Sequence, residues 1–548
     1  MRENNRPRRR LIVLTAVFAV FAVIIAACGG GSSGKSSNSS NNSKPKAGGK
    51  ITYGLEAITT SFCLPSAQLS IAGIIPAEAV YDTLTEPDAS GKTVPYLAKS
   101  VTHNSTYDQW TITLRPGISF TDGEPLNAAA VKQNIDAWRK GLLLSFVFTD
   151  IANVTTPNDM TVVVQLKRPW VVFDGYLWST GRVGIAAPAQ LNNTATCDRN
   201  MIGTGPFKLK NGPSSYDPTT GSIDVVKNPN YWRKGYPLLD EIQFKAVEDS
   251  QIRTTQLQGG QLDVEQDDTG KNLNTIEGLS NISVEKEPAG YRELGHGLIN
   301  VQRAPLSDLR IRKAVAEGTD RNALNQINNA GKWDIANGVL DSKVLGYVSD
   351  PGLPQYNPSD AKKQVASWKA DHNGATPTFA LATTTDAIVQ QLAQEIQSEM
   401  KKIGINVTLP TPVLQSALIN DAIAGHVDAF LWRNYPGLDP DGLYVWFHSG
   451  STVNFNHLND PEIDHDLDMG RITADTSKRA GFYSDLDKRM SSQVYNLWNW
   501  YETWFIAHNN NVQGILGPNL PDANGAVGND KPADILAGYH QLIGMYRS

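Results

Sequence analysis

Residues 378–409 have the sequence TFALATTTDAIVQQLAQEIQSEMKKIGINVTL. The segments 378–382 and 405–409 read as short strands, and between them apolar residues recur at every fourth position. These residues form one face of an amphipathic helix: Ile388, Leu392, Ile396 and Met400. Asp386 can cap the start of this helix and Gly404 can end it. A strand-helix-strand unit of this length predicts two parallel strands joined by a right-handed crossover, and therefore an α/β fold.

Similar patterns extend from this unit toward both ends of the chain. Predicted strands lie at residues 50–54, 110–114, 161–166, 207–209, 223–226 and 238–247. Predicted helices lie at residues 127–141, where Asn127 is a suitable N-cap, and at residues 249–258. Near the C-terminus, Trp498 and Trp500 share one face of a predicted strand.

The length and charge of the chain limit the classes of function. The chain has 548 residues, which exceeds the size at which a single core keeps growing, so two or more domains are expected. Its formal net charge is −6 and no basic run follows the N-terminus, which argues against a nucleic-acid partner. After residue 27 no apolar stretch is long enough to span a bilayer, so the body of the protein is expected to lie in water.

The N-terminus has the organisation of an export signal. A basic start is followed by an apolar run that ends in Ile25-Ala26-Ala27, directly before Cys28. This arrangement resembles a bacterial lipobox, which implies a signal peptide at residues 1–27 and lipidation of Cys28. Residues 28–48 then form a flexible linker, because almost all of them are small or polar. The expected location is the extracytoplasmic face of the bacterial cell membrane; the alternative is an uncleaved anchor helix.

Cysteine and histidine usage bears on disulfides and metals. Cys63 and Cys197 are predicted to form a disulfide because exported proteins meet an oxidising environment; a buried free thiol at each position is the alternative. No metal or cofactor is expected, since His448, His457 and His465 fit no helical metal-ligand face. The acidic residues at 263–268 lack the glycine and closing glutamate of an EF-hand, and a solvated strand end and turn is predicted there.

Four groups of segments follow one another in a recognisable order. The first comprises Tyr81–Leu84, Val94–Ala98, Trp110–Phe120 and Asp122–Ala128. The second comprises Gly203–Phe207, Lys227–Trp232 and Leu239–Ile242, and the third is Leu306–Arg321. The fourth comprises Trp432, Asp439–Asp441, Asn454–Phe455 and Asn459–Asp464. Together they resemble the family 5 extracellular solute-binding proteins, the peptide- and nickel-binding components of ABC importers, over most of residues 50–510.

The resemblance implies a two-lobed, periplasmic-binding-protein-like α/β fold with an additional domain inserted in the first lobe. The expected boundaries are residues 49–75, 199–300 and 505–548 for the first lobe, 76–198 for the inserted domain, and 301–504 for the second lobe. A ligand that contacts both lobes would stabilise the closed form, because only there can it reach both walls.

The resemblance also implies where the ligand binds. In family members that bind peptides, an acid three residues after a tryptophan often holds the amino group of the ligand. Here Tyr435 stands three residues after Trp432, and a tyrosine cannot neutralise a buried ammonium as a carboxylate can. Arg433 is a candidate to receive an anionic group instead, against an internal ion pair or simple solvation. The candidate ligand-binding residues are Trp432, Arg433, Asn434, Tyr435, Tyr444, Glu56, Phe62, Trp498 and Trp500, with core packing as the alternative for the aromatic ones.

The expected function is that of a lipid-anchored solute-binding protein. It would deliver oligopeptides or related small polar solutes to an ABC permease of the cytoplasmic membrane, and act as a monomer. One alternative is a non-peptide cargo, such as a sugar or a metal chelate. Another is an exported enzyme that reuses the fold, although the sequence offers no set of nucleophile, base and orienting residue, so no catalytic residues are expected.

Overall fold

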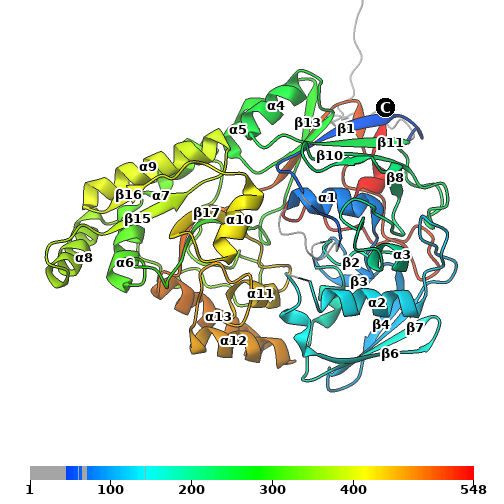
Figure 1. Ribbon diagram of the computed structural model, residues 1–548, viewed down its shortest axis with the longest axis horizontal. Helices are drawn as coiled ribbons and strands as arrows, with labels where there is room; N and C mark the ends of the chain where they lie inside the picture. Colours follow the sequence, from blue (N-terminus) through cyan, green and yellow to red (C-terminus); the bar gives the residue numbers. More distant parts are fainter. Residues whose placement is uncertain (1–44, 60, 64–70, 142, 180) are drawn as a thin grey trace, which may run out of the picture. The chain divides into compact units, whose positions relative to one another are not determined.

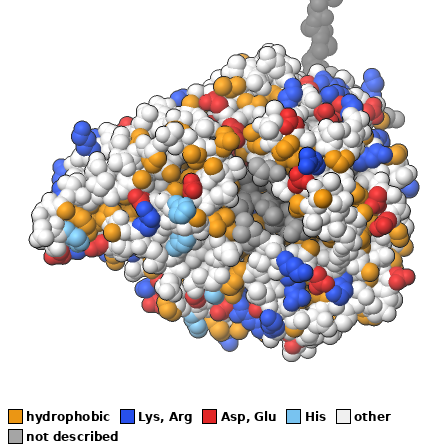
Figure 2. Space-filling model, in the orientation of Figure 1, with side chains coloured by type: hydrophobic (Ala, Val, Ile, Leu, Met, Phe, Trp, Pro, Cys, Tyr) orange, Lys and Arg blue, Asp and Glu red, His pale blue; other side chains and the backbone are white. Residues whose placement is uncertain are grey.

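The computed structural model describes residues 45–59, 61–63, 71–141, 143–179 and 181–548, without the side chains of Trp498 and Asn499. The predicted signal peptide, Cys28 and nearly all of the predicted linker lie outside these residues. No helix in the described part of the chain combines the length and hydrophobicity that crossing a bilayer requires. On the face drawn in Figure 2, Lys and Arg side chains are interspersed with Asp and Glu side chains rather than gathered in one patch.

An eight-stranded sheet forms the first lobe. Its strands are β1 (Lys50–Leu55), β8 (Phe207–Pro213), β9 (Tyr216–Asp217), β10 (Ser222–Lys227), β11 (Glu241–Ala246), β12 (Val264–Asp267), β13 (Ile282–Lys286) and β19 (Phe505–Asn509). The order is β13-β19-β12-β1-β11-β10-β8, with β9 beside β10, so β19 from near the C-terminus lies between β12 and β13. Strands β11, β1 and β12 are parallel and end at one edge of the sheet. Figure 1 shows β1, β10 and β11 together at upper right.

The helices of the first lobe cover this sheet. They are α1 (Ile71–Val80), α4 (Ser250–Gln258) and α5 (Gly270–Ile276). The C-terminal segment adds the short pair β20 (Val512–Gln513) and β21 (Tyr546–Arg547), with the 3₁₀ turn η5 (Leu542–Gly544). The predicted helix at residues 249–258 is α4, which Asp249 caps by accepting a hydrogen bond from the Ile252 N–H at 2.9 Å.

A five-stranded sheet forms the second lobe. Its strands are β14 (Leu294–Ile299), β15 (Thr378–Ala382), β16 (Asn406–Thr408), β17 (Ala429–Asn434) and β18 (Asn496–Tyr501), in the order β16-β15-β17-β14-β18. The strand-helix-strand prediction is confirmed, because β15 and β16 pair in parallel and a long helix connects them. This helix is α9 (Ala387–Ile403), with Asp386 as its N-cap and Gly404 as its C-cap at a φ of 90°.

The remaining helices of the second lobe surround its sheet. They are α6 (Leu309–Gly318), α7 (Arg321–Asn329), α8 (Pro358–Asp371), α10 (Gln415–Ile423), η4 (Pro440–Leu443), α11 (Tyr444–Phe447), α12 (Pro461–Ile472) and α13 (Thr476–Ser492). Figure 1 places α8, α9 and β15 at the left, away from the first sheet. Strand β14 belongs to the second sheet, so the chain enters the second lobe before residue 301, where the expected boundary lies.

An additional four-stranded sheet belongs to the inserted domain. It consists of β4 (Ala98–His103), β5 (Gln109–Leu114), β7 (Thr161–Leu166) and β6 (Ile151–Asn158), in that order. The other elements are β2 (Thr85–Pro87), β3 (Thr93–Pro95), α2 (Ala128–Trp138), α3 (Pro188–Leu191), η2 (Val147–Asp150) and η3 (Phe173–Leu177). Asn127 caps α2 by accepting from the Ala130 N–H at 2.9 Å. A disulfide joins Cys63 to Cys197.

Candidate ligand-binding cleft

Two connections join the sheets of the two lobes. Residues 287–293 lead from β13 to β14, and residues 502–504 lead from β18 back to β19. Both connections carry buried carboxyl groups. Glu287 accepts hydrogen bonds from the backbone N–H groups of Trp504 (3.2 Å) and Ala537 (2.8 Å). Glu293 accepts from the indole N–H of Trp504 at 2.8 Å, so the two connections are also bonded to each other.

A cavity lies between the lobes, where strands of both sheets end; we call it the interlobe cavity. From the first lobe it is lined by Glu56, which follows β1, Glu248, which follows β11, and Asp268, which follows β12. These residues meet because the three strands are parallel, so their carboxyl ends share one edge. From the second lobe, residues 384–386 after β15 and Arg433 on β17 complete the wall. The cavity holds about 890 Å³, part of it open to solvent.

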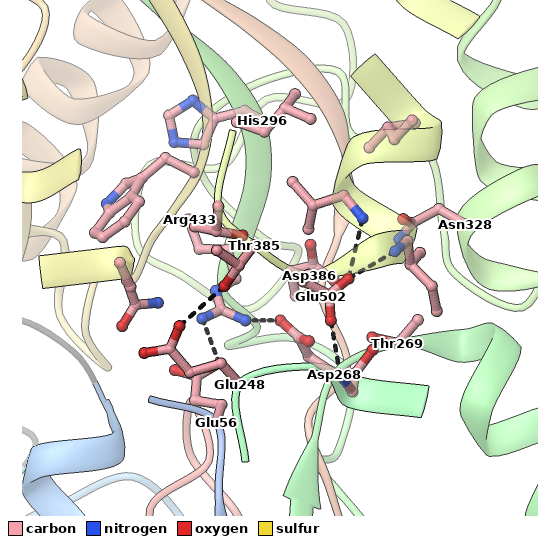
Figure 3. Close-up of a pocket in the computed structure, with 18 of the residues that line it drawn as sticks. Glu56, Glu248, Asp268, Thr269, His296, Asn328, Thr385, Asp386, Arg433 and Glu502 are labelled. Atoms are coloured by element: carbon pink, nitrogen blue, oxygen red, sulfur yellow. Dashed lines mark hydrogen bonds and ion pairs between the residues drawn. The ribbon is translucent and has the colours of Figure 1, made fainter. Parts of the chain in front are cut away.

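Arg433 crosses the interlobe cavity. Its guanidinium contacts Glu56 at 2.7 Å and also pairs with Asp268, as Figure 3 shows. It lies over the ring of Trp504, with 4.7 Å from the guanidinium carbon to the ring centroid. The internal ion pair is therefore the arrangement that the structure shows for Arg433. Because Glu56 and Asp268 belong to the first lobe and Arg433 to the second, this contact ties the lobes together.

Several carboxyl groups lie around the guanidinium of Arg433. Burial raises the pKa of Glu56, against the opposing effect of Arg433. Burial also raises the pKa of Glu293 to about 7. The pKa of Glu502 lies well above its usual value, because this side chain is buried and faces Asp268. Desolvation and mutual repulsion thus favour protonation of part of this cluster.

A second contact between the lobes uses one carboxylate at two helix N-termini. Asp386 accepts hydrogen bonds from the backbone N–H groups of Ile388 (2.8 Å) and Val389 (3.0 Å), at the start of α9. Its other oxygen accepts from the Ser250 N–H at 2.8 Å, at the start of α4 in the first lobe. Beside it, the Thr385 hydroxyl donates to Glu248 at 3.0 Å. These contacts describe a closed form, in which the two lobes touch along the cavity (Figure 3).

A further cavity lies between the inserted domain and the second lobe; we call it the inserted-domain cavity. It holds about 1290 Å³, part of it open to solvent. Much of its wall is apolar and aromatic, including Leu143, Val172, Trp178, Leu438, Val445 and Trp446. A small junction cavity lies beside the two larger ones. It shares Trp432, Arg433 and Gln415 with the interlobe cavity and Arg182 and Tyr435 with the inserted-domain cavity. The three cavities adjoin one another, and we refer to them together as the cleft.

A buried ion-pair network forms part of the wall of the inserted-domain cavity. Arg471, on α12, contacts Asp441 at 3.0 Å and Asp150 of the inserted domain at 3.2 Å. Its guanidinium carbon lies 3.5 Å from the ring centroid of Tyr444 and 4.2 Å from that of Trp170. The indole N–H of Trp170 donates to Asp441 at 2.9 Å. The inserted domain and the second lobe are thus joined by ion pairs that are largely buried.

The structure brings together five of the residues proposed from the sequence. Trp432, Arg433, Tyr435, Glu56 and Trp500 all line the cleft. The side chain of Trp498 lies outside the described part of the chain.

Tyr444, Phe62 and Asn434 are not among the residues that line the cleft. The Tyr444 hydroxyl contacts Arg168 (2.7 Å) and Asp468 (3.0 Å), as part of the network around Arg471. Phe62 is fully buried in the core of the first lobe, and Asn434 is hydrogen-bonded to His296 at 2.9 Å. These three side chains pack within the protein, which is the alternative stated for the aromatic pair.

The prediction of a solvated acidic turn at residues 263–268 is wrong. Glu265 and Asp267 are 0% and 1% exposed, because they face the buried guanidinium of Arg253 at 3.9 Å and 3.5 Å. Arg253 lies on α4, and no local spacing marks it as their partner. The sequence reasoning also missed Arg182 and Asp386 as residues of the cleft. In the sequence, Asp386 was recognisable only as a helix N-cap, and no sequence pattern marked Arg182 as a residue of the cleft.

The fold and the cleft define a class of protein: two α/β lobes, linked by two connections, that close on a shared cavity. Residues 92–455 match the family described as bacterial extracellular solute-binding proteins, family 5 Middle. The chain therefore belongs to family 5 of the bacterial extracellular solute-binding proteins.

Curated relatives and solved structures agree with this family. The chain is 26% identical to the nickel-binding periplasmic protein of Escherichia coli K12 over 449 residues, which are 76% of this chain and 83% of that protein. It is 25% identical over 433 residues to the probable D,D-dipeptide-binding periplasmic protein DdpA of the same strain. The match covers 77% of this chain and 81% of that protein.

Two solved structures share the fold. AgaA in complex with agropinic acid, from A. tumefacien R10, has a TM-score of 0.80 at 23% identity and covers 91% of this chain and 99% of its own. The oligopeptide-binding protein AppA of Bacillus subtilis, in complex with a nonapeptide, has a TM-score of 0.79 at 21% identity and covers 92% and 100%. At these identities the likeness concerns the fold.

Proposed function

We propose that this protein is the extracytoplasmic receptor of an ABC importer, and that its cargo binds in the cleft formed by the three cavities. The observation that carries the proposal is the two-sided wall, in which carboxyl ends of strands from both sheets face one cavity. A cargo that touches both walls stabilises the closed form, because the open form offers only one wall at a time. The closed form is then presented to a permease of the cytoplasmic membrane, and the cargo leaves unaltered.

We propose small polar solutes, with oligopeptides as the first candidate, as the cargo class. The relative named as a probable D,D-dipeptide-binding protein and the likeness to AppA with a nonapeptide support this class. A non-peptide cargo is the second candidate, and the sequence at the cleft favours it. Tyr435 occupies the position where a carboxylate would hold a peptide's amino group. One relative is named for nickel, and AgaA, which shares the fold, was solved in complex with agropinic acid.

Mass spectrometry of small molecules released from the purified protein by mild denaturation tests the proposal. We expect one compound, or one class, released in near-stoichiometric amount and chemically unchanged when added back. For that compound, Trp432→Ala should weaken binding at least tenfold, about 1.4 kcal/mol, because Trp432 lines two of the three cavities.

Tyr356→Ala, at an aromatic residue 49% exposed on the second lobe, is the matched control and should bind normally. Recovery of a converted product would contradict the proposal. So would a Trp432→Ala variant that melts much lower but binds the compound as the native protein does.

We also propose that the protein is a monomer held at the membrane through Cys28. Replacing Cys28 with Ser should release it into the soluble fraction, because the acyl chains supply roughly 0.8 kcal/mol per buried CH₂ and no other anchor is proposed. The measurement is membrane pelleting after a carbonate wash, compared with the unaltered chain. Pelleting of the Ser variant to the same extent would show that another segment holds the protein there.

A further inference from the structure

The interlobe cavity and the junction cavity carry an excess of acidic side chains. Among the described residues of their walls there are six carboxyl groups and three guanidinium groups. The carboxyl groups belong to Glu56, Glu248, Asp268, Glu293, Asp386 and Glu502, and the guanidinium groups to Arg182, Arg253 and Arg433. Arg253 also faces two further buried acids, Glu265 and Asp267. The closed form therefore encloses more negative than positive charge unless some of these carboxyl groups bind protons.

Four of the six carboxyl groups have partners that favour the charged form. Glu56 and Asp268 share the ion pairs of Arg433. Asp386 accepts from three backbone N–H groups, and Glu248 accepts from the Thr385 hydroxyl at 3.0 Å. The uncompensated charge of the cavities is therefore concentrated on the remaining two acids, Glu293 and Glu502.

Glu293 and Glu502 lie in the two connections between the lobes. The Glu502 N–H donates to the Glu293 carbonyl oxygen at 2.8 Å, so the two connections are bonded at these residues. Glu502 is 6% exposed, and Gly295 on β14 leaves room for its carboxyl group, because a Cβ there would overlap it. Glu502 lines the interlobe cavity and Glu293 the junction cavity. Opening of the lobes about these connections would bring water to both carboxyl groups.

The closed form favours the protonated state of both groups. Burial raises the pKa of Glu293 to about 7, and Asp268 and Glu56 raise it further against the effect of Arg433. Burial also raises the pKa of Glu502 well above its usual value, and the nearby charge of Asp268 adds to this. A hydrated glutamate loses its proton near pH 4.3. Both groups therefore hold a proton more tightly in the closed form than in an open one.

The other titratable groups at this point keep one charge state around neutral pH. Burial lowers the pKa of Arg182 to about 10, so its guanidinium stays positive. The pKa of Tyr435 lies well above its usual value, so its hydroxyl stays neutral. Burial lowers the pKa of His296 to about 3, so this ring stays uncharged. Glu287 lies behind Glu293 and lines neither cavity, and burial raises its pKa well above the usual value.

We propose that closing of the lobes is coupled to proton binding by Glu293 and Glu502, so that the closed form is favoured at mildly acidic pH and gives way to the open form as the pH rises past neutral. A group whose pKa is higher in the closed form stabilises that form fully below its open-form pKa, and this contribution is lost as the pH rises through the closed-form pKa. The inference rests on the proposed function, because it concerns the same closure, and it adds regulation by pH. A cargo that requires the closed form would bind more tightly at acidic pH.

Fluorescence energy transfer between dyes at Gln258→Cys on α4 and Lys362→Cys on α8 provides the test, in the Cys28→Ser chain after exhaustive dialysis. Both positions are exposed, one on each lobe. With one proton held at a pKa of about 7, the ratio of closed to open protein should fall about tenfold from pH 6 to pH 8 at constant ionic strength. A second proton on Glu502 would increase this change to as much as about a hundredfold.

Three variants assign the response to these two residues. The double variant Glu293→Gln, Glu502→Gln keeps polar side chains of the same size that cannot titrate, so its ratio should change less than twofold over this range. Glu293→Gln alone should remove about tenfold of the response, and it decides the matter if melting temperatures show that the double variant does not fold. Glu124→Gln, at an exposed carboxyl group of the inserted domain, is the control and should respond as the native chain does.

Two outcomes would overturn the proposal: a ratio that does not change with pH in the native chain, or a native response that the glutamine variants leave intact. If the native chain stays fully closed, the titration is repeated with Asp386→Ala, which lacks the contact with Ser250, and a ratio independent of pH there overturns the proposal as well. The proposed function would survive either result if a co-purified compound closes the lobes at fixed pH. A pH response without any compound that closes the lobes would support the coupling and count against the proposed function alone.

Discussion

Replacement of Arg471 by alanine is expected to lower the free energy of unfolding by about 3–5 kcal/mol. The Arg471 side chain is 0% exposed and is the cation that faces both Asp441 and Asp150. Asp441 is also 0% exposed, so removing the guanidinium leaves a carboxylate that neither water nor a cation compensates. The variant also loses the contacts of the guanidinium with the rings of Tyr444 and Trp170. Urea denaturation followed by tryptophan fluorescence measures the change.

Two further variants make this result specific. Arg199→Ala, at an exposed ion pair of 3.6 Å with Asp198, should change stability by less than about 1 kcal/mol. Adding Asp441→Asn to Arg471→Ala should recover part of the loss, because the stranded charge is then absent. A loss below about 1 kcal/mol for Arg471→Ala would mean that water enters the network and that the inserted domain is not fastened there.

Replacement of Arg433 by methionine is expected to shift the protein from its closed form toward an open one by at least tenfold, about 1.4 kcal/mol. In the closed form Glu56 and Asp268, both on the first-lobe wall, would then lie in the cavity without the guanidinium that now joins them. In an open form water can hydrate both carboxylates. Only the closed form loses an interaction, so the equilibrium moves.

Spin labels at Gln258→Cys on α4 and Lys362→Cys on α8 report the distance between the lobes by pulsed electron resonance. Both positions are exposed, Cys63 and Cys197 are held in a disulfide, and the labelled variants carry Cys28→Ser. Arg303→Met is the control, because Arg303 pairs with Asp428 inside the second lobe. Distance distributions that coincide for the Arg433→Met variant and the protein with the native arginine would show that the other contacts between the lobes suffice to hold the closed form.

Local patterns in the sequence predicted much of the fold. The unit from β15 through α9 to β16 was readable because its periodicity, N-cap and C-cap all lie within one short segment. The strands β8 and β10 were also readable from the local alternation of their residues. The boundary near residue 300 differed because the resemblance places segments only in order. Which sheet β14 joins depends on its pairing with β17 and β18, which are distant in sequence.

The cleft was only partly predictable, for a different reason. Trp432 and Tyr435 follow a recognisable motif and do line the cleft. Tyr444 belongs to the same stretch of chain, but it packs against Arg471. No spacing in the sequence predicts this contact. Arg182 comes from the inserted domain and reaches the cleft only through tertiary packing. Contacts between side chains that are far apart in the chain produce no periodic pattern in the sequence. The role of a charged residue therefore cannot be predicted from such a pattern before the fold is known.

The position of β19 bears on how the molecule is assembled as it is made. This strand pairs with both β12 and β13, yet the ribosome produces it after the whole second lobe. Domains tend to fold as they emerge from the N-terminal side. Here the first lobe cannot do so, since its sheet lacks an inner strand until the chain is almost complete. For a member of a family of extracellular proteins, this order of synthesis delays completion of the first lobe until nearly the whole chain has been made.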